Sequence, residues 1–452
     1  MQKQISPRAT YFTLFILLFG ILLSLQLGFS AFYGIFLGIL AVYIMAFLHG
    51  YNHKTLLRMM FVGIKNAWIV LIIMMMIGVI IGLWMHCGTI PTMMYMGFKY
   101  LSNLNFVLTT FLISSIISMV LGTSLGTIST VGLALIGIGK GLNIPLPLLV
   151  GAVVSGGYVG DRSSPMSSSA NLTAVMTNTK LIDNLKHMMH TLTPVYLFCM
   201  VFYWFMGRNY LSSKAVNPEV IKLQHLLSSN FHISFILLIP PIFIILMAIF
   251  RFSMIKSLSM GLLSSFALML YSNHYTFYEI MYTAFIGFHP DNIEVSSILS
   301  GGGLLSMQGV ILIIASSTAL NGILDGTGMI APLIEKSIAT VKNIGDLILR
   351  TSLLCFVIDM ITCNQTLSVI IPGKFLQPIF EKKGISKNTL ARTISDTGII
   401  MVPLIPWNVN AIVISAIFNV PVLQFAPFSI LCYLLPVITI IYGYLGFIKK
   451  YS

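Results

Sequence analysis

Long apolar runs follow one another along the whole chain and are separated by short polar segments. A run of about 20 apolar residues is long enough to cross a bilayer as a helix. The plainest runs are residues 11–27, 31–48, 68–85, 193–206, 231–250, 257–271, 298–324, 347–361 and 428–448. We therefore expect an all-α polytopic membrane protein with about 10–12 membrane segments. The first run lacks a small-residue cleavage pattern, and we expect it to be retained as a span.

Other apolar stretches are interrupted by Gly, Pro, Ser and Thr. They are residues 106–139, 364–380 and 390–406, whereas residues 146–160 lead into the polar motif at 160–165 and residues 411–420 form a short apolar segment. Backbone groups freed by a break at membrane depth must find partners inside the protein or line a cavity. These stretches therefore predict broken helices or re-entrant hairpins. The segment 54–65 mixes Lys and Arg with apolar residues, which predicts a short helix near the lipid headgroups.

Short motifs recur at similar offsets in the two parts of the chain. Residues 82–91 resemble 322–332 at an offset of 240 (322 minus 82), and 140–142 resemble 383–385 at 243 (383 minus 140). Asp161 and Asp396 lie 235 residues apart (396 minus 161). We expect a first transmembrane repeat at 1–206, a hydrophilic linker at 207–230 and a second transmembrane repeat at 231–452. Paired repeats with broken helices are typical of secondary transporters built from inverted repeats.

Composition and charge narrow the class of protein further. Only 8% of the residues are charged and 57% are hydrophobic, which excludes a soluble enzyme, a nucleic-acid binder and a disulfide-rich secreted module. The net charge of +13 comes from basic residues between the apolar runs. Basic loops favour the cytoplasmic side, so Lys3 and Arg8 predict a cytoplasmic N-terminus in a multi-pass protein of the plasma membrane. The five cysteines show no C-x-x-C pair and are expected to be buried apolar residues.

Only four of the twelve acidic residues fall at membrane depth. They are Asp161, Asp325, Asp359 and Asp396. An ionised carboxylate there costs several kcal/mol and indicates function. Asp161 and Asp396 are the strongest candidates for Na⁺ or proton binding, because each lies in the broken stretch of its repeat. The alternatives are that Asp161 pairs with Arg162 or that these acids cap helices, and Asp325 is expected to be a cap.

Polar side chains surround the two main candidates in the sequence. Hydroxyls near Asp161 come from Ser163, Ser164, Ser167, Ser168 and Thr173, and those near Asp396 from Ser395 and Thr397. Further polar residues at membrane depth are Ser124, Thr127, Ser129, Thr130, Asn171, Asn364, Gln365, Thr366, Asn408 and Asn410. Hard cations prefer such oxygen ligands, although hydrogen bonds between helices also explain many intramembrane Ser and Thr. A carboxylate that takes either a proton or Na⁺ would give coupled exchange.

Two of these stretches resemble the NhaC family of sodium/proton antiporters, in the ion transporter superfamily. The family pattern G-D-K/R-x-S-P-x-S is met by Gly160, Asp161, Arg162, Ser164, Pro165 and Ser167. The second pattern, D-S/T-G followed by P-L-I-P-W-N, is met by Asp396, Thr397, Gly398, Pro403, Leu404, Ile405, Pro406, Trp407 and Asn408. The resemblance spans nearly the whole chain.

The resemblance implies a secondary active transporter, not an enzyme, that exchanges Na⁺ for H⁺ by elevator-like alternating access in a homodimer. It implies no cofactor other than the transported ions, and no nucleic-acid partner. With the residue analysis, it gives the expected ion- or substrate-binding set: Asp161, Ser164, Ser167, Asn171, Asp359, Asn364, Thr366, Asp396, Thr397 and Asn408. Asp161 and Asp396 are expected to share one Na⁺ site at the midplane.

Two departures from the family pattern keep another substrate open. Ser168 and Asn364 stand where many members carry an acid, and fewer site carboxylates would leave room for an organic solute. The alternative function is therefore a Na⁺- or H⁺-coupled transporter of small carboxylates or amino acids. An intramembrane aspartyl protease is disfavoured, because the first glycine of its G-x-G-D signature is missing before Asp161. A channel is disfavoured because repeated broken helices suit alternating access better than an open pore.

Overall fold

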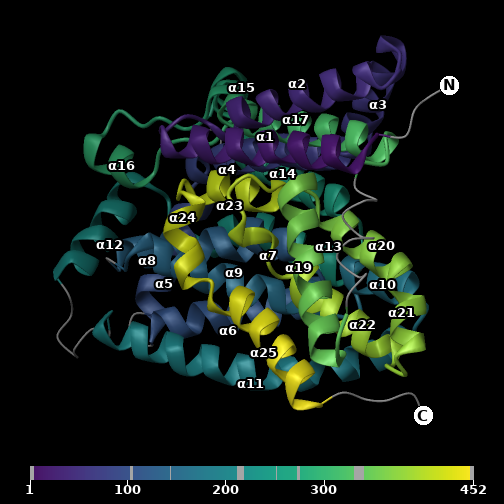
Figure 1. Cartoon of the computed structure of the whole chain (residues 1–452). Coiled ribbons are helices and arrows are strands. Elements are labelled where there is room, and N and C mark those ends of the chain that lie inside the picture. Colours follow the sequence, from purple (N-terminus) through teal and green to yellow (C-terminus); the bar gives the residue numbers. More distant parts are fainter. Residues whose placement is uncertain are drawn as a thin grey trace.

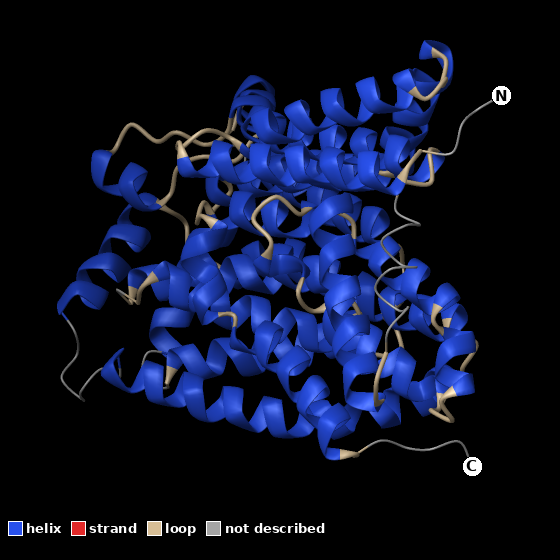
Figure 2. Ribbon diagram, viewed as in Figure 1, coloured by secondary structure: helices blue, strands red, loops and turns tan. Residues whose placement is uncertain are grey.

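The computed structural model describes residues 5–101, 105–142, 144–210, 218–250, 252–271, 275–329 and 341–447. Within these ranges the protein is all-helical, as expected (Figure 2), and the only strand-like pairing is an isolated bridge between Phe288 and Gly301. All five cysteines are buried and unpaired, as their positions predicted.

The helices are named in chain order as in Figure 1. Up to residue 210 they are α1 (Pro7–Gln26), α2 (Ala31–Leu48), α3 (His53–Asn66), α4 (Trp68–His86), α5 (Thr89–Leu101), α6 (Phe106–Leu121), α7 (Ser124–Thr127), α8 (Leu133–Gly141), α9 (Leu146–Ser163), α10 (Ser168–Met176) and α11 (Leu181–Gly207). After residue 217 they are α12 (Pro218–Asn230), α13 (Ile239–Ile249), α14 (Met254–Tyr271), α15 (Phe277–Ile286), α16 (Ile293–Ile298), α17 (Gln308–Gly326), α19 (Ile344–Thr362), α20 (Gln365–Phe375), α21 (Gln377–Lys382), α22 (Lys387–Ile394), α23 (Val409–Phe418), α24 (Val422–Phe425) and α25 (Ile430–Leu445).

Fewer helices than expected are both long and apolar enough to cross a membrane. The described residues contain six such helices, or up to nine if each of three bent helix pairs counts as one span. The expected number was 10–12. Part of the difference has a physical cause: α9 carries two charged residues in its last turn, α19 carries three along its length, and α6 has only 16 residues. These helices are buried in protein, so they need less apolar surface than a lipid-facing span.

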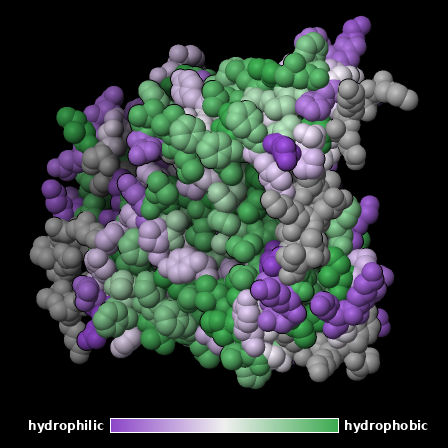
Figure 3. All heavy atoms as spheres, viewed as in Figure 1, coloured by the Kyte–Doolittle hydropathy of each residue, from purple (hydrophilic) through white to green (hydrophobic). Residues whose placement is uncertain are grey.

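The helices form a bundle with an apolar belt. In Figure 1, α1, α2 and α17 lie along one edge, α11 lies along the opposite edge, and α6, α9 and α19 fill the space between them. Figure 3 shows hydrophobic atoms across the middle of this face and hydrophilic atoms toward its left and right edges. This distribution is the one expected of a helical bundle that lies across a bilayer.

The basic segment 54–65 forms the expected short helix, α3, but one face of α3 packs on the bundle. At Gly63 the backbones of α3 and α17 approach closely, and its hydrogen-only side chain lies against Gly322. Lys54 and Lys65 remain exposed. The helix is therefore both a surface element and a wall of the bundle.

Two apolar stretches are broken between consecutive helices, and each break contacts the loop of another broken stretch. α6 ends at Gly122 (φ +69°) and α7 begins two residues later; α19 ends at Cys363 (φ +54°) and α20 begins two residues later. The two breaks lie 241 residues apart (363 minus 122). Each break is held by a hydrogen bond from the loop of the other broken stretch in the same half of the chain. At the first break the Ser164 hydroxyl donates to the Met119 carbonyl (2.7 Å). At the second break the Trp407 indole donates to the Met360 carbonyl (2.7 Å). The interruptions expected within 106–139 and around 364 are therefore confirmed as breaks between helices, whereas 146–160 lies in one continuous helix, α9.

Candidate functional site

Asp161 lies near the end of α9, where three helix beginnings meet. Its side chain is buried, and its carboxylate accepts hydrogen bonds from Ser124 (3.0 Å), Ser169 (3.2 Å) and Gln365 (3.3 Å). These donors lie at the first residue of α7, the second of α10 and the first of α20. The N-terminal ends of α10 and α20 carry partial positive charge, which favours a negative carboxylate. The hydrogen bonds to the Asp161 carboxylate therefore come from neutral groups only.

The contact with Gln365 joins the two halves of the chain. Asn410 of α23 donates to the amide oxygen of Gln365 (3.0 Å) and to the hydroxyl of Tyr158 (3.3 Å) on α9. Gln365 is thereby fixed between Asn410 and the Asp161 carboxylate. A movement of α20 or α23 relative to α9 would change the ligands of Asp161 directly.

Asp396 has a different environment from Asp161. It lies in a π-helical turn (Ser395–Ile399) after α22 and forms a fully buried ion pair with Arg162, whose Nε and Nη2 both reach its Oδ1. Its Oδ2 accepts hydrogen bonds from Thr191 of α11 (2.9 Å) and Thr439 of α25. Arg162 also donates to the Met188 carbonyl (3.1 Å). Both oxygens of Asp396 are thus fully engaged.

This geometry bears on one alternative and one expectation. Arg162 pairs with Asp396, so the alternative of an ion pair between Asp161 and Arg162 is not formed. The expected Na⁺ site shared by Asp161 and Asp396 is not assembled either, because the guanidinium group of Arg162 occupies one of the two carboxylates. The link between Asp161 and Asp396 is indirect: Arg162 follows Asp161 in the chain and binds Asp396.

A second buried arginine lies beside this pair. Arg392 on α22 is 1% exposed, and its Nε and Nη2 have no hydrogen-bond partner among the described residues. It is one turn from Asp396 and interacts electrostatically with Asp396 and Arg162. The cluster therefore holds two cations and one carboxylate, which makes the charge of Asp396 indispensable to it.

The other two membrane-depth acids are also in contrasting places. Asp359 of α19 is fully buried, and neither carboxylate oxygen has a hydrogen-bond partner within the described ranges. Asp325 lies at the exposed C-terminal end of α17 and lines a cavity. It is therefore not the N-terminal cap that would satisfy free backbone N–H groups, contrary to our expectation of a capping role.

Most of the other predicted site residues hold the loops at the breaks. Ser167, Asn364 and Asn408 are the N-caps of α10, α20 and α23. Ser164 binds the Met119 carbonyl, Asn171 the Ser167 carbonyl (2.7 Å), and Thr397 the Thr393 carbonyl (2.7 Å). Thr366 is exposed in the cavity. These residues fix the shape of the site, and none of these hydrogen bonds reaches the carboxylate of Asp161.

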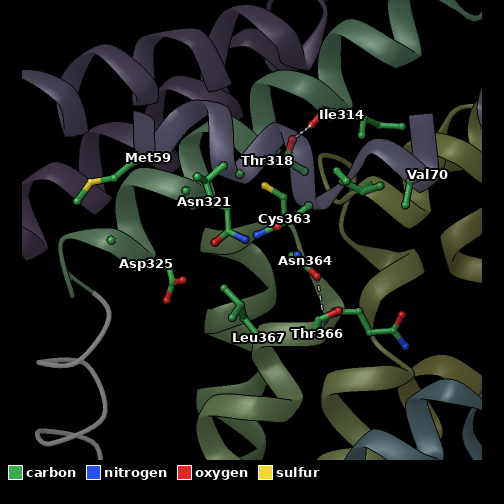
Figure 4. Close-up of a pocket in the computed structure, with 18 of the residues that line it drawn as sticks. Met59, Val70, Ile314, Thr318, Asn321, Asp325, Cys363, Asn364, Thr366 and Leu367 are labelled. Atoms are coloured by element: carbon green, nitrogen blue, oxygen red, sulfur yellow. Dashed lines mark hydrogen bonds between the residues drawn. The ribbon is translucent and has the colours of Figure 1, made fainter. Parts of the chain in front are cut away.

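A cavity of about 660 Å³ lies between α3, α17, α20 and α23. It is lined by Gln365 and Asn410, the two amides that connect to Asp161, and by the exposed side chains of Arg58 and Asp325. Figure 4 shows Asn321 and Asp325 on α17 and, across the cavity, the segment that carries Asn364 and Thr366. Two charged side chains at its wall indicate that the cavity is wet.

Several functional contacts were missed by the sequence analysis. Ser124, Gln365 and Asn410 were recognised as polar residues at membrane depth, but not as partners of Asp161. Ser169 follows the motif directly and could have been included. Thr191 and Thr439 carry no signal in the sequence, because each is a single hydroxyl in a helix far from Asp396 along the chain. The described residues contain no cluster of His, Cys, Asp and Glu that could hold a metal ion.

Comparison with known proteins gives a consistent family. The model of the Na⁺/H⁺ antiporter family matches residues 157–447. The chain is 31% identical to the Na⁺/H⁺ antiporter NhaC of Bacillus subtilis over 404 residues, which cover 89% of this chain and 88% of that protein. It is 27% identical to the malate-2H⁺/Na⁺-lactate antiporter of the same organism (95% and 94% covered). It is 29% identical to the arginine/ornithine antiporter ArcD of Halobacterium salinarum (86% and 81% covered). The chain therefore belongs to the Na⁺/H⁺ antiporter family and is an NhaC-type membrane transporter.

Proposed function

We propose that the protein exchanges Na⁺ for H⁺ and that Asp161 is the group that binds them in turn. The observation that carries this proposal is the neutral surrounding of Asp161. The carboxylate is buried, has only hydroxyl and amide partners, and forms no ion pair within the described ranges. Hydroxyl and amide oxygens can turn toward a bound Na⁺, whereas an ion-paired arginine would exclude it. Asp396 instead positions Arg162 and α9.

The exchange follows from competition at one carboxylate. Na⁺ is a hard cation that prefers oxygen ligands, and Asp161, Ser124 and Ser169 offer them together. When Asp161 takes a proton, its charge is lost and Na⁺ leaves. Each ion binds while the site faces one side of the membrane and is released after the site has moved to face the other. Occupancy by one ion excludes the other, because both need the same carboxylate.

We further propose that alternating access arises from movement of two inverted repeats. The two helix breaks at Gly122 and Cys363 lie 241 residues apart and support paired repeats of similar design. Asp161 belongs to the first half and Gln365 to the second, so a movement of one half against the other would open and close the site. An elevator-like movement within a homodimer remains a prediction from the family resemblance.

The test uses everted membrane vesicles that contain a pH-sensitive dye and a preset proton gradient. Addition of Na⁺ should collapse the gradient with the wild type and have little effect with Asp161→Asn. A matched control is Asp346→Asn, in the first turn of α19, where the partly buried Asp346 pairs with Arg350 (2.8 Å). No response of the wild type to Na⁺ would refute the exchange, and a normal response of Asp161→Asn would refute the site.

The cavity favours a second candidate function, the coupled transport of a small carboxylate or amino acid. Arg58 could bind a carboxylate group and Asp325 an ammonium group, while Asn66, Asn321 and Asn364 offer neutral hydrogen bonds. The volume of about 660 Å³ is within the range of small-molecule sites. Uptake of a panel of labelled amino acids and carboxylates into proteoliposomes distinguishes the two functions. Saturable uptake that Arg58→Gln abolishes would support this candidate.

A further inference from the structure

Four neutral side chains form a closed ring of hydrogen bonds with Asp161. Ser124 (3.0 Å) and Gln365 (3.3 Å) both donate to the same carboxylate oxygen, Oδ2. On the far side of the ring, the Asn410 amide donates to Gln365 (3.0 Å) and to the hydroxyl of Tyr158 (3.3 Å). Tyr158 is fully buried and has a side-chain hydrogen bond with Ser124, which closes the ring.

The carboxylate sets the direction of every bond in this ring. An ionised carboxylate only accepts hydrogen bonds, so Gln365 presents its NH₂ group to Asp161 and its oxygen to Asn410. The single proton of Ser124 is used toward Asp161, so Tyr158 is the donor in its bond with Ser124. Both arms of the ring therefore run from the NH₂ group of Asn410, which has two donors, to Oδ2 of Asp161.

A bound Na⁺ needs the opposite direction. Na⁺ takes oxygen ligands, so the NH₂ group of Gln365 and the proton of Ser124 must turn away from Oδ2. The ring can accept this change, because hydroxyl and amide groups each carry both a donor and an acceptor. After both amides turn over, the Asn410 oxygen accepts from Gln365 and Tyr158. Tyr158 in turn accepts from Ser124, and each proton in the ring again has an acceptor.

The amides and the hydroxyls of the ring differ in their access to water. Gln365 and Asn410 are half-buried and line the cavity of about 660 Å³, so water there can bind an amide group that loses its partner in the ring. Ser124 and Tyr158 are 3% and 0% exposed. Their two protons therefore depend on partners within the ring, and in the Na⁺-bound form the last acceptor is the Asn410 oxygen.

Proton binding does not require the reversal. Ser169 donates to the other carboxylate oxygen, Oδ1 (3.2 Å), and its hydroxyl can instead accept a hydrogen bond from a proton placed on Oδ1. Oδ2 then remains an acceptor for Ser124 and Gln365. The ring therefore keeps its direction with a proton and changes it with Na⁺.

We propose that Tyr158 and Asn410 are positioning residues for Na⁺. Reversal of the ring through them lets Ser124 and Gln365 present oxygen to the ion. This inference rests on the proposed exchange at Asp161 and deepens it. Removal of the Tyr158 hydroxyl or of the Asn410 amide leaves one buried proton without an acceptor in the Na⁺-bound form only. That proton belongs to Ser124 in the first case and to Tyr158 in the second. Both changes should weaken Na⁺ binding and spare proton binding.

Tyr158→Phe and Asn410→Leu test this inference. Binding of ²²Na⁺ to the purified protein at one alkaline pH gives the Na⁺ affinity, and exchange in proteoliposomes at saturating Na⁺ gives the maximal rate. Each variant should need about tenfold more Na⁺ for half-saturation, the effect of one buried donor without a partner, and keep a maximal rate close to that of the wild type. The double variant should need no more Na⁺ than a single variant, because it also leaves one buried proton without a partner. Independent effects would instead multiply to about hundredfold.

Tyr203→Phe is the matched control. Tyr203 is also fully buried, but its hydroxyl binds Ser155 (2.7 Å) and the Phe428 carbonyl (2.7 Å), which lie outside the ring. This variant should keep the wild-type Na⁺ affinity even if it is less stable, because half-saturation does not depend on the yield of folded protein. Wild-type affinity in either Tyr158→Phe or Asn410→Leu, or a double variant weakened about hundredfold, would overturn the inference. A wild type that binds no Na⁺ would instead refute the proposed function.

Discussion

Asp161 and Asp396 show how one residue type can have two functions at membrane depth. Both are buried aspartates in broken stretches, and both stand out in the sequence for the same reason. Asp161 has three neutral donors, whereas Asp396 has an arginine and two hydroxyls. A carboxylate held by neutral groups can exchange ligands, because no fixed charge must be left behind. A carboxylate bound to a buried guanidinium cannot do so cheaply.

Asp396→Asn should therefore be a stability variant before it is a transport variant. Removal of the carboxylate leaves Arg162 and Arg392 buried without a counter-charge, and loss of one partner of a buried pair costs about 3–5 kcal/mol. Thermal unfolding in detergent should show a much larger loss than in Asp325→Asn, whose exposed position predicts a change within about 0.5 kcal/mol. The double variant Arg162→Met, Asp396→Leu should recover part of the loss. An Asp396→Asn protein as stable as the wild type would contradict the assigned role.

The sequence predicted the important acids but not their partners. Scarcity of charge was enough to identify Asp161, Asp359 and Asp396, because an acid at membrane depth is rarely accidental. The pairing of Arg162 with Asp396 depends on how two distant segments pack. No local pattern distinguishes it from a pairing with the adjacent Asp161, and so both remained possible.

At the scale of elements, the contacts between the helix breaks and the neighbouring loops form the site around Asp161. Gly122 ends α6 in the left-handed conformation, and a Cβ there would collide with Met166 and Ser167 in the loop after α9. This contact brings the end of α6 and the start of α10 together around Asp161. Breaks were predictable from Gly, Pro and hydroxyl residues in apolar runs. The contact between a break and its neighbouring loop was not predictable, because it joins segments some 40 residues apart (166 minus 122 is 44).

Two glycines allow the close contact at Gly122 to be tested separately from backbone strain. Gly122 and Gly384 have nearly the same φ (+69° and +68°), but a Cβ at Gly384 would meet nothing within 4 Å. Both alanine variants should lose about 1–2 kcal/mol from the left-handed conformation. Only Gly122→Ala should lose more stability and most of its Na⁺/H⁺ exchange. Equal effects of the two substitutions on exchange would show that the close approach is unimportant.

At the scale of the whole molecule, each half supplies what the other lacks. The first half carries Asp161 and Arg162, and the second half carries Gln365 and Asp396, which bind them. Family resemblance and short repeated motifs indicated two related parts. The division at 207–230 remains a prediction, although an independent helix, α12, lies within this segment. The exchange of partners between halves means that neither part has a complete site alone.

Orientation in the membrane can be tested from both edges of the apolar belt. In Figure 1, α3 and the start of α1 lie toward the right edge, and α12 lies at the left edge. The basic helix α3 and the start of α1 therefore lie toward one edge, which the positive-inside rule assigns to the cytoplasm. Lys54 and Lys222 are both exposed, and all five native cysteines are buried, so single cysteines at these positions can be labelled selectively.

A membrane-impermeant maleimide should label Lys222→Cys in intact cells and Lys54→Cys only in everted vesicles. The two variants control for each other, because each should be silent where the other reacts. The reverse pattern would place the N-terminus outside and refute the predicted orientation. Labelling of both variants in intact cells would mean that α3 and α12 lie on the same side. The hydrophilic left and right edges of the face in Figure 3 would then not lie on opposite sides of the membrane.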